Sequence, residues 1–264
     1  MSAITIRGRD ASSGRVMVAL AWRSLVNIRR LPSAFIPSII FPVFFTISFS
    51  GAFSAVTNLP GFATDNALSW YVPMSVIQGA AFAGLGTGFT TARDLEDGFF
   101  DRLLLAPTSR LALLGGALLA SILRALLVAV LVILVGVVGG AEVPGGAAGL
   151  GMLLVASAGI AVAGGAWGLG IVYRIKSQSA GPLIQVGIFT AIFLSTAQVP
   201  LDVMDGWLHA VARVNPVTTI LALARQGFLG HVTWADTWPG LVSFAGLLLV
   251  LGLFAVRGLQ RLTP

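Results

Sequence analysis

The residues with the clearest chemical potential form a charged segment, RDLEDGFFDRLLLAPTSR, at positions 93–110. It holds seven ionised side chains between two long apolar runs. A charge at the centre of a bilayer costs roughly 2.5–3.5 kcal/mol on insertion scales, so this segment is expected to lie in water between two membrane spans. Its phenylalanines and leucines, interleaved with the charges, predict a short amphipathic helix. These residues are therefore expected to bind a partner, through charge pairing and burial of aromatic rings.

Residue types for catalysis or metal binding are scarce. No G-x-x-x-x-G-K-[ST] phosphate-binding loop is present, so the chain is not expected to hydrolyse ATP itself. Glycines within apolar runs, such as Gly164 and Gly168, are expected to be helix-packing sites. The two histidines, His209 and His231, lie apart among apolar residues, and cysteine is absent. We therefore expect no catalytic residue, no metal site and no cofactor in this chain.

The composition is that of an integral membrane protein. Apolar residues make up 56% and charged residues 10%, and the mean hydropathy is +0.93, outside the range of soluble domains. The formal net charge is +6. The arginines flank apolar runs and do not cluster with aromatic residues, which argues against a nucleic-acid partner.

Six apolar runs have about the length of a membrane-spanning helix, which needs roughly 20 residues. We therefore predict an all-α integral membrane protein with six transmembrane helices, forming one domain over residues 1–264. The expected spans are residues 34–56, 70–91, 111–138, 147–173, 182–199 and 238–256.

The placement of arginine and lysine orients these spans. The N-terminal segment, the charged segment 93–110 and the C-terminal end carry basic residues, whereas loops 57–69 and 139–146 carry none. By the positive-inside rule, both termini are cytoplasmic. Abundant arginine and alanine with a single lysine suggest a bacterial genome, so we expect a multi-pass protein of a bacterial inner or plasma membrane.

Residues 15–31 predict a helix that lies in the plane of the membrane. Arg23, Asn27 and Arg30 share one helical face, whereas Val18 and Trp22 lie away from it. This pattern is typical of an interfacial amphipathic helix. The alternative is a solvated arginine-rich leader.

Residues 200–237, between the fifth and sixth spans, contain apolar pieces that are too short to cross a membrane. Asn215-Pro216 separates two of these pieces, as Asn-Pro normally interrupts a helix. We predict two short re-entrant helices in the outer leaflet. The alternative is a seventh, irregular span, which would place the C-terminus outside.

Taken together, these features resemble the permease subunits of type 2 ABC transporters, and among them the daunorubicin-type drug-resistance permeases. The resemblance covers nearly the whole chain. Three segments carry it: the charged segment with its acidic-Gly, Arg-Leu and Pro-x-Ser-Arg elements, LSTAQVPLDVMDGWLHAVARVNPVT at 194–218 followed by Arg225, and the arginine-bearing helix before the first span.

The resemblance implies that segment 93–110 contains a coupling helix, which docks on a separate ATPase subunit. Two ATPase copies would bind ATP and Mg, and a second permease, identical or a paralogue, would complete the transporter. The complex would expel a hydrophobic drug, antibiotic or lipid-like compound by alternating access. The implied interface residues are Asp94, Glu96, Asp97, Gly98, Phe99, Phe100, Asp101, Arg102, Leu103 and Pro107.

The resemblance also places the second and fifth spans along the central transport route. An aromatic cavity with few polar groups would suit a large amphiphile, although the glutamines could equally bond neighbouring helices. Arg124, in the third span, is expected to be structural and to pair with a carboxylate or a carbonyl. The predicted pathway residues are Gln78, Phe82, Phe89, Gln185, Phe189, Thr190 and Phe193.

Other functions stay open at this stage. Export of a glycan or glycolipid would use the same family architecture with a wider channel. An ion-coupled secondary transporter would need carboxylates within the membrane, but no Asp or Glu lies inside a predicted span. A membrane scaffold would need no ATPase.

Overall fold

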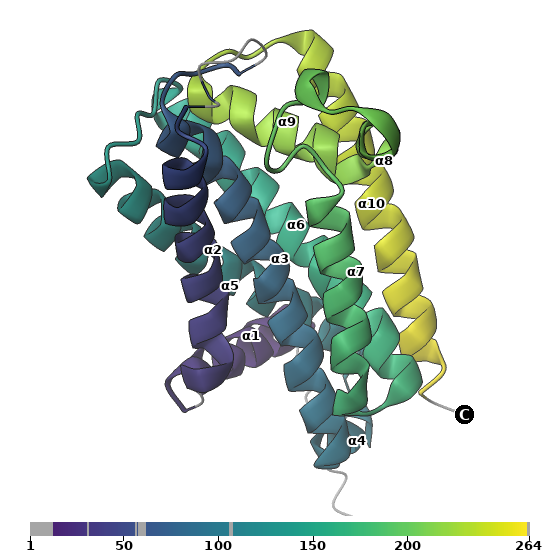
Figure 1. The fold of residues 1–264 in the computed structure, drawn as a ribbon. Helices are drawn as coiled ribbons and strands as arrows, with labels where there is room; N and C mark the ends of the chain where they lie inside the picture. Colours follow the sequence, from purple (N-terminus) through teal and green to yellow (C-terminus); the bar gives the residue numbers. More distant parts are fainter. Residues whose placement is uncertain (1–12, 31, 56, 58–61, 106–107, 263–264) are drawn as a thin grey trace, which may run out of the picture.

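The structure is a computed structural model that describes residues 13–30, 32–55, 57, 62–105 and 108–262. Within these residues the fold is helical without β-strands, as predicted (Figure 1). The helices are α1 (Ser13–Arg30), α2 (Pro32–Ala52), α3 (Ala67–Glu96), α4 (Phe99–Leu105), α5 (Arg110–Val138), α6 (Gly146–Ile175), α7 (Gly181–Phe193), α8 (Gly206–Val214), α9 (Pro216–Leu229) and α10 (Trp234–Gln260), with 3-10 turns η2 (Gln178–Ala180) and η3 (Leu201–Val203).

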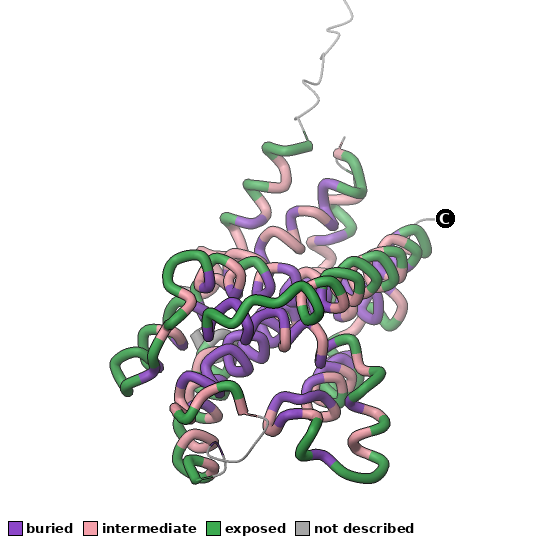
Figure 2. The backbone as a smooth tube through the Cα atoms, turned by 90° about the horizontal axis from the view of Figure 1, so that it is seen from above, coloured by how far each residue is buried: buried purple, intermediate pink, exposed green. Residues whose placement is uncertain are grey.

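Helix α3 forms the centre of the bundle, packed by α2, α5, α6, α7 and α9. Twenty of its thirty residues are buried, and the buried backbone is concentrated in the interior of Figure 2. Small residues bring α3 and α6 close together, because a Cβ built on Gly84 would lie 2.5 Å from the Gly165 backbone nitrogen. Gly88 lies similarly against Gly168. The glycines of α6 are therefore packing sites, as predicted.

Three helices, α5, α6 and α10, are long and apolar enough to cross a membrane. Shorter apolar stretches cover Ile36–Ala52 and Gln178–Phe193. Large apolar side chains on the outer faces of α2, α5 and α10 are exposed, which suits contact with lipid. Helix α3 is equally long but more polar; its neighbours surround it, so its composition does not have to match lipid. The exposed apolar residues include Ile40, Ile47, Leu127, Leu131, Leu134, Leu249 and Leu253.

One end of the bundle collects α4, the start of α1 and the end of α10 (Figure 1). The Ser13 and Ser109 hydroxyl oxygens lie 3.2 Å apart, which joins α1 to the start of α5. At the end of α6, Arg174 donates to the Phe254 carbonyl of α10 at 3.2 Å. We call this the α4 end. The start of α1 and the end of α10 therefore lie at the same end of the bundle.

Helix α7 is shorter than the predicted fifth span. The prediction of residues 182–199 is wrong at its C-terminal end, because the helix stops at Phe193. Thirteen helical residues span only about 20 Å, whereas the hydrocarbon core is about 30 Å thick. The remaining residues run through turns to Pro200.

Polar side chains from α3 and from the α8–α9 segment satisfy the carbonyls beyond this early helix end. A helix terminus leaves its last carbonyls without backbone partners, and each unpaired group is costly inside a bilayer. The contacts therefore explain how the chain can unwind here. Asn215 Nδ2 donates to Ala191 O at 2.7 Å and Leu194 O at 2.8 Å, Arg225 donates to Thr196 O and Ala197 O at 2.8 Å each, and Tyr71 Oη donates to Gln198 O at 2.9 Å.

Two helices, α8 and α9, occupy the predicted outer segment 200–237 and meet at Asn215. The Asn215 side chain accepts from the Val217 amide at 2.9 Å and so caps α9. Helix α9 is largely buried against α3, α6 and α10. The depth of α8 and α9 in the membrane stays a prediction, as does the interfacial placement of α1.

Candidate functional site

A tight corner joins α3 to the short helix α4 within the charged segment. Helix α3 ends at Glu96, and the Asp97 amide donates to the Arg93 carbonyl at 2.9 Å. Gly98 follows with a φ of +66°, a left-handed conformation that costs glycine little. The chain can therefore turn at once into α4, the short helix predicted from the alternation of charged and aromatic residues.

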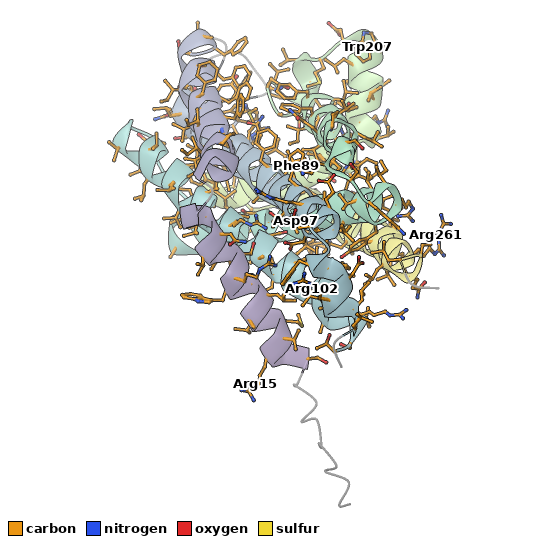
Figure 3. All side chains as sticks on the ribbon, turned by 90° about the horizontal axis from the view of Figure 1, so that it is seen from below. Arg15, Phe89, Asp97, Arg102, Trp207 and Arg261 are labelled. Carbon is orange, nitrogen blue, oxygen red and sulfur yellow. The ribbon has the colours of Figure 1, made fainter. Side chains whose placement is uncertain are left out.

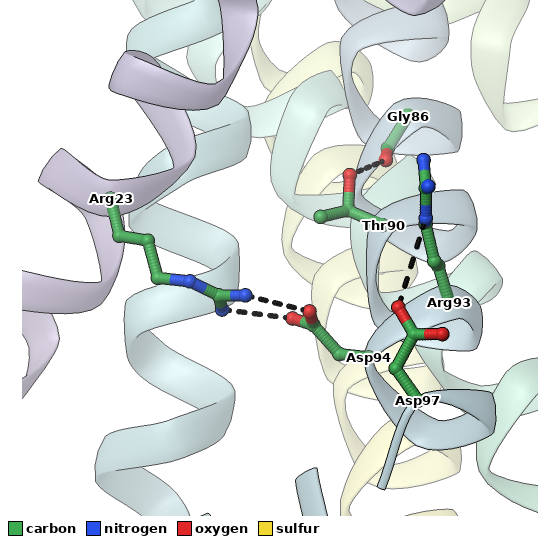
Figure 4. A network of polar contacts seen from close by, with 6 residues as sticks. All are labelled: Arg23, Gly86, Thr90, Arg93, Asp94 and Asp97. Carbon is green, nitrogen blue, oxygen red and sulfur yellow. Dashed lines mark hydrogen bonds and ion pairs between the residues drawn. The ribbon is translucent and has the colours of Figure 1, made fainter. Parts of the chain in front are cut away.

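Part of the predicted interface faces inward and anchors this corner. Asp94 accepts two hydrogen bonds from the Arg23 guanidinium of α1, at 2.7 and 3.0 Å (Figure 4). The same guanidinium lies 3.9 Å from the centre of the Phe99 ring. Phe100 is buried, with its ring 5.7 Å from that of Tyr173 on α6. These contacts tie α4 to α1 and α6.

Glu96 anchors the corner to the turn that precedes α7. Its carboxylate accepts from the Ser177 hydroxyl and the Gln178 amide, each at 2.8 Å, and from the Gln178 side chain. Hydrogen bonds from Gln178 and Ser177 to the ionised form hold the pKa of Glu96 below its usual value of 4.5. The α3–α4 corner is thus joined to α1, α6 and α7.

Acidification is expected to weaken this link. Because the folded-state pKa of Glu96 lies below that of the unfolded chain, its contribution to stability is present at neutral pH and is lost as the pH falls below about 4.5. The melting temperature of Glu96→Ala should therefore lie below wild type at pH 7, with the difference shrinking as the pH falls from about 4.5 to about 3. Gln178→Ala, which removes the side-chain donor to Glu96 but no titrating group, should diminish this pH dependence. An equal difference at both pH values would contradict the assignment.

The remaining predicted residues leave an outward face on α4. Asp97 is 66% exposed, and Asp101 and Arg102 are also exposed. Figure 3 shows Asp97 and Arg102 where α3 passes into α4. Leu105 is 87% exposed but is not among the residues predicted from the sequence. Gly98 and Leu103 are half-buried, and Pro107 lies outside the described residues. We define the outward face as Asp97, Asp101, Arg102 and Leu105, four exposed residues at the α3–α4 corner and on α4.

Three of the predicted pathway residues form an aromatic surface. Phe189 of α7 lies 5.3 Å from Phe82 of α3 and 5.6 Å from Phe193, between ring centres. Helix α2 extends this surface with three rings that the sequence prediction omits, although their spacing of four residues puts them on one helical face. The added contacts are Phe41–Phe82 at 6.1 Å, Phe45–Phe193 at 5.9 Å and Phe45–Phe49 at 5.2 Å.

The other predicted pathway residues lie elsewhere. Gln78 is fully buried, and within the described part of the chain its amide oxygen and nitrogen have no hydrogen-bond partner. Gln185 and Thr190 are exposed on α7. Phe89 is 37% exposed and its ring packs against Gly181. The structure thus gathers three of the four phenylalanines of the predicted pathway, Phe82, Phe189 and Phe193, but not its polar groups.

A cavity of about 280 Å³ lies between α1, α2, α3 and α5. Arg23, Asp94 and Arg124 are among its lining residues. Arg124 donates to the Ala120 carbonyl at 3.3 Å and to the Thr87 hydroxyl at 2.7 Å. The predicted carbonyl partner is therefore present, whereas no described carboxylate pairs with Arg124. Over the same described residues, no three His, Asp or Glu side chains gather as metal ligands.

Comparison with known proteins identifies relatives over most of the chain. A family model described as "ABC-2 type transporter" matches residues 15–229. The daunorubicin resistance ABC transporter permease protein DrrB1 of Streptomyces coeruleorubidus is 26% identical over 242 residues, which cover 89% of this chain and 83% of the relative. A transport permease named ycf38 from Cyanophora paradoxa is 28% identical over 224 residues, covering 83% and 75%. The ycf38 protein of Porphyra purpurea is 26% identical over 260 residues, covering 92% and 88%.

Proposed function

Because this chain belongs to the ABC-2 type transporter family, we propose that it is the permease subunit of an ATP-driven exporter of hydrophobic drugs, antibiotics or lipid-like compounds. The family match is the observation that carries the proposal. The compound class rests on the similarity to a daunorubicin resistance permease and on the aromatic surface, which offers a large amphiphile apolar contacts. Because of this family membership, we prefer an ATP-driven exporter to the ion-coupled secondary transporter that the sequence left open.

The complete transporter would contain two ATPase subunits and a second permease, either identical or a paralogue. Part of the aromatic surface supports a partner, since Phe41 is 46% exposed and the neighbouring Phe44 is 58% exposed. In this arrangement the surface faces the second permease across the transport route. The arginine placement supports a plasma-membrane orientation in which the α4 end is cytoplasmic.

The outward face of α4 would receive the ATPase. Its carboxylates and Arg102 can set the register of docking, and Leu105 can enter an apolar groove. Closure of the ATPases on ATP would push this helix. Because Arg23–Asp94, Phe100–Tyr173 and Glu96–Gln178 fasten the corner to α1, α6 and α7, the push moves these helices together. The aromatic surface would then turn from inward-facing to outward-facing.

A charge-reversal variant on the outward face tests ATPase docking. Asp101→Arg/Arg102→Glu alters two exposed side chains that form no hydrogen bond or ion pair within the described part of the chain, so the fold should be preserved. We expect the ATPase to co-purify with tagged wild-type chain and to fall at least about tenfold in the variant, as several charged contacts are lost. The measurement is ATPase recovered per permease after co-expression with ABC ATPases of the same genome, the neighbouring reading frame first.

Asp202→Arg/Arg213→Glu is the matched control, because it reverses the same two charges at exposed residues of η3 and α8 in the outer segment. It should retain the ATPase at the wild-type level. Recovery of the ATPase at the wild-type level with both the α4 variant and the control would exclude α4 as the docking element. Loss in both would indicate a general effect of charge.

A further inference from the structure

Arg124 is a buried cation with spare hydrogen-bonding capacity. It lies in the middle of apolar helix α5 and is only 7% exposed. Its two hydrogen bonds, to Ala120 and Thr87, use Nε and Nη2. Nη1 has no partner among the described residues and lies 3.5 Å from where a Cβ on Gly86 would stand. A guanidinium at this depth without a carboxylate is costly, and such residues in membrane proteins are usually functional.

The described residues that line the cavity beside Arg124 carry one unbalanced positive charge. Three arginines and two carboxylates line it. Arg23 pairs with Asp94 at 2.7 Å, and Arg93 lies 3.8 Å from Asp97 (Figure 4). These pairs cancel, so that among the described lining residues Arg124 is left without a counter-charge. The cavity therefore attracts anions and disfavours cations.

The shape of the cavity suits an amphiphile. Gly86 lies eight residues before Asp94 on α3, so the Arg124 guanidinium stands about 12 Å further into the bundle than the Arg23–Asp94 pair. Arg93 and Asp97 at the lower edge are more than half exposed, which leaves an approach from the α4 end. Phe82 and Phe89 supply an apolar wall. Phe82 also belongs to the aromatic surface, so the cavity adjoins that surface.

We propose that this cavity binds the anionic head group, a phosphate or a carboxylate, of a single amphiphile, with Arg124 as its counter-charge. Nη1 and the free hydrogen of Nη2 donate to the anion, and the alkyl or aromatic part lies along Phe82. Binding at equilibrium requires no ATP. Only the assignment of the bound molecule as transported cargo rests on the proposed export function.

The test is binding of a fluorescent alkyl phosphate to the full chain in phosphatidylcholine nanodiscs, compared with the matching alkyl trimethylammonium. Wild type should prefer the phosphate. Arg124→Gln should weaken phosphate binding about tenfold or more, as one charge-assisted contact is lost, without weakening trimethylammonium binding. The control Arg213→Gln, at an exposed arginine on α8, should change neither affinity. Unchanged phosphate binding in Arg124→Gln, or an equal loss for both probes, would overturn the proposal.

A second variant covers the case in which Arg124→Gln does not fold. Gly86→Val keeps the charge and fills the space beside Nη1, where a Cβ meets only that nitrogen at ordinary contact distance. It should also weaken phosphate binding about tenfold, and undiminished binding would overturn the site.

Two further arms identify the source of the anion. Competition by phosphatidylglycerol identifies a resident lipid, whereas ATP-dependent transfer of the probe to the opposite leaflet identifies cargo, and either result supports the site. If no ATPase associates with the chain, the export function fails, but the equilibrium binding result remains interpretable.

Discussion

Arg225→Ala is expected to be among the most destabilising single substitutions in this protein, lowering the free energy of unfolding by about 3–5 kcal/mol. The guanidinium donates to the carbonyls of Thr196 and Ala197 at 2.8 Å and lies 3.8 Å from the centre of the Trp70 ring. Removal would leave two carbonyls at the exit of α7 without these partners in the protein interior, since Arg225 is only 5% exposed. The measurement is thermal unfolding of the purified chain in detergent, followed by tryptophan fluorescence.

Arg213→Ala is the control, since Arg213 is exposed on α8 and should change stability by less than about 0.5 kcal/mol. Arg225→Lys should fall between the two, because an ammonium cannot span two carbonyls with the planar fork of a guanidinium. If Arg225→Ala and Arg213→Ala have the same melting temperature, Arg225 does not stabilise the chain at the exit of α7.

The contrast between α7 and its predicted span shows where sequence reasoning ends. Residues 182–199 form a nearly continuous apolar run, and nothing local stops a helix before Pro200. The helix ends at Phe193 because Asn215 and Arg225 supply donors from sites 21 to 29 residues away. Such a contact is a tertiary property, so the pattern of the run could not reveal it. The longer helices α5, α6 and α10 follow their apolar runs closely, because composition alone decides them.

The charged segment divides in a similar way. Alternating charges and aromatic residues correctly predict a short helix after α3, but they treat Phe100 and Leu103 as equal members of a docking surface. Phe100 is buried against Tyr173, whereas Leu105 is almost fully exposed. Which face of a seven-residue helix turns inward depends on its neighbours, here α1 and α6. The α2 phenylalanines were within reach of sequence reasoning, because their four-residue spacing is visible in the chain.

Gly84 and Gly86, two residues apart on α3, should differ strongly in how much stability the same substitution costs. A Cβ on Gly84 would lie 2.5 Å from Gly165 N and 2.8 Å from Ala161 O, both backbone atoms that cannot rotate away. Gly84→Val should therefore force α3 and α6 apart and lower the free energy of unfolding by about 3 kcal/mol or more. A Cβ on Gly86 meets only Arg124 Nη1 at 3.5 Å, so Gly86→Val should stay within about 1 kcal/mol of wild type.

The pair isolates packing from every other property of the substitution. Both sites lie in the same helix, so valine alters helix propensity and side-chain entropy equally at each. A large loss of melting temperature in Gly84→Val alone therefore measures the close approach of α3 to α6. A similar loss in both variants would mean that valine itself is poorly tolerated in α3, and equal tolerance would mean that α3 and α6 separate at little cost. That last result would also weaken the view that α3 and α6 move as one body when α4 is pushed.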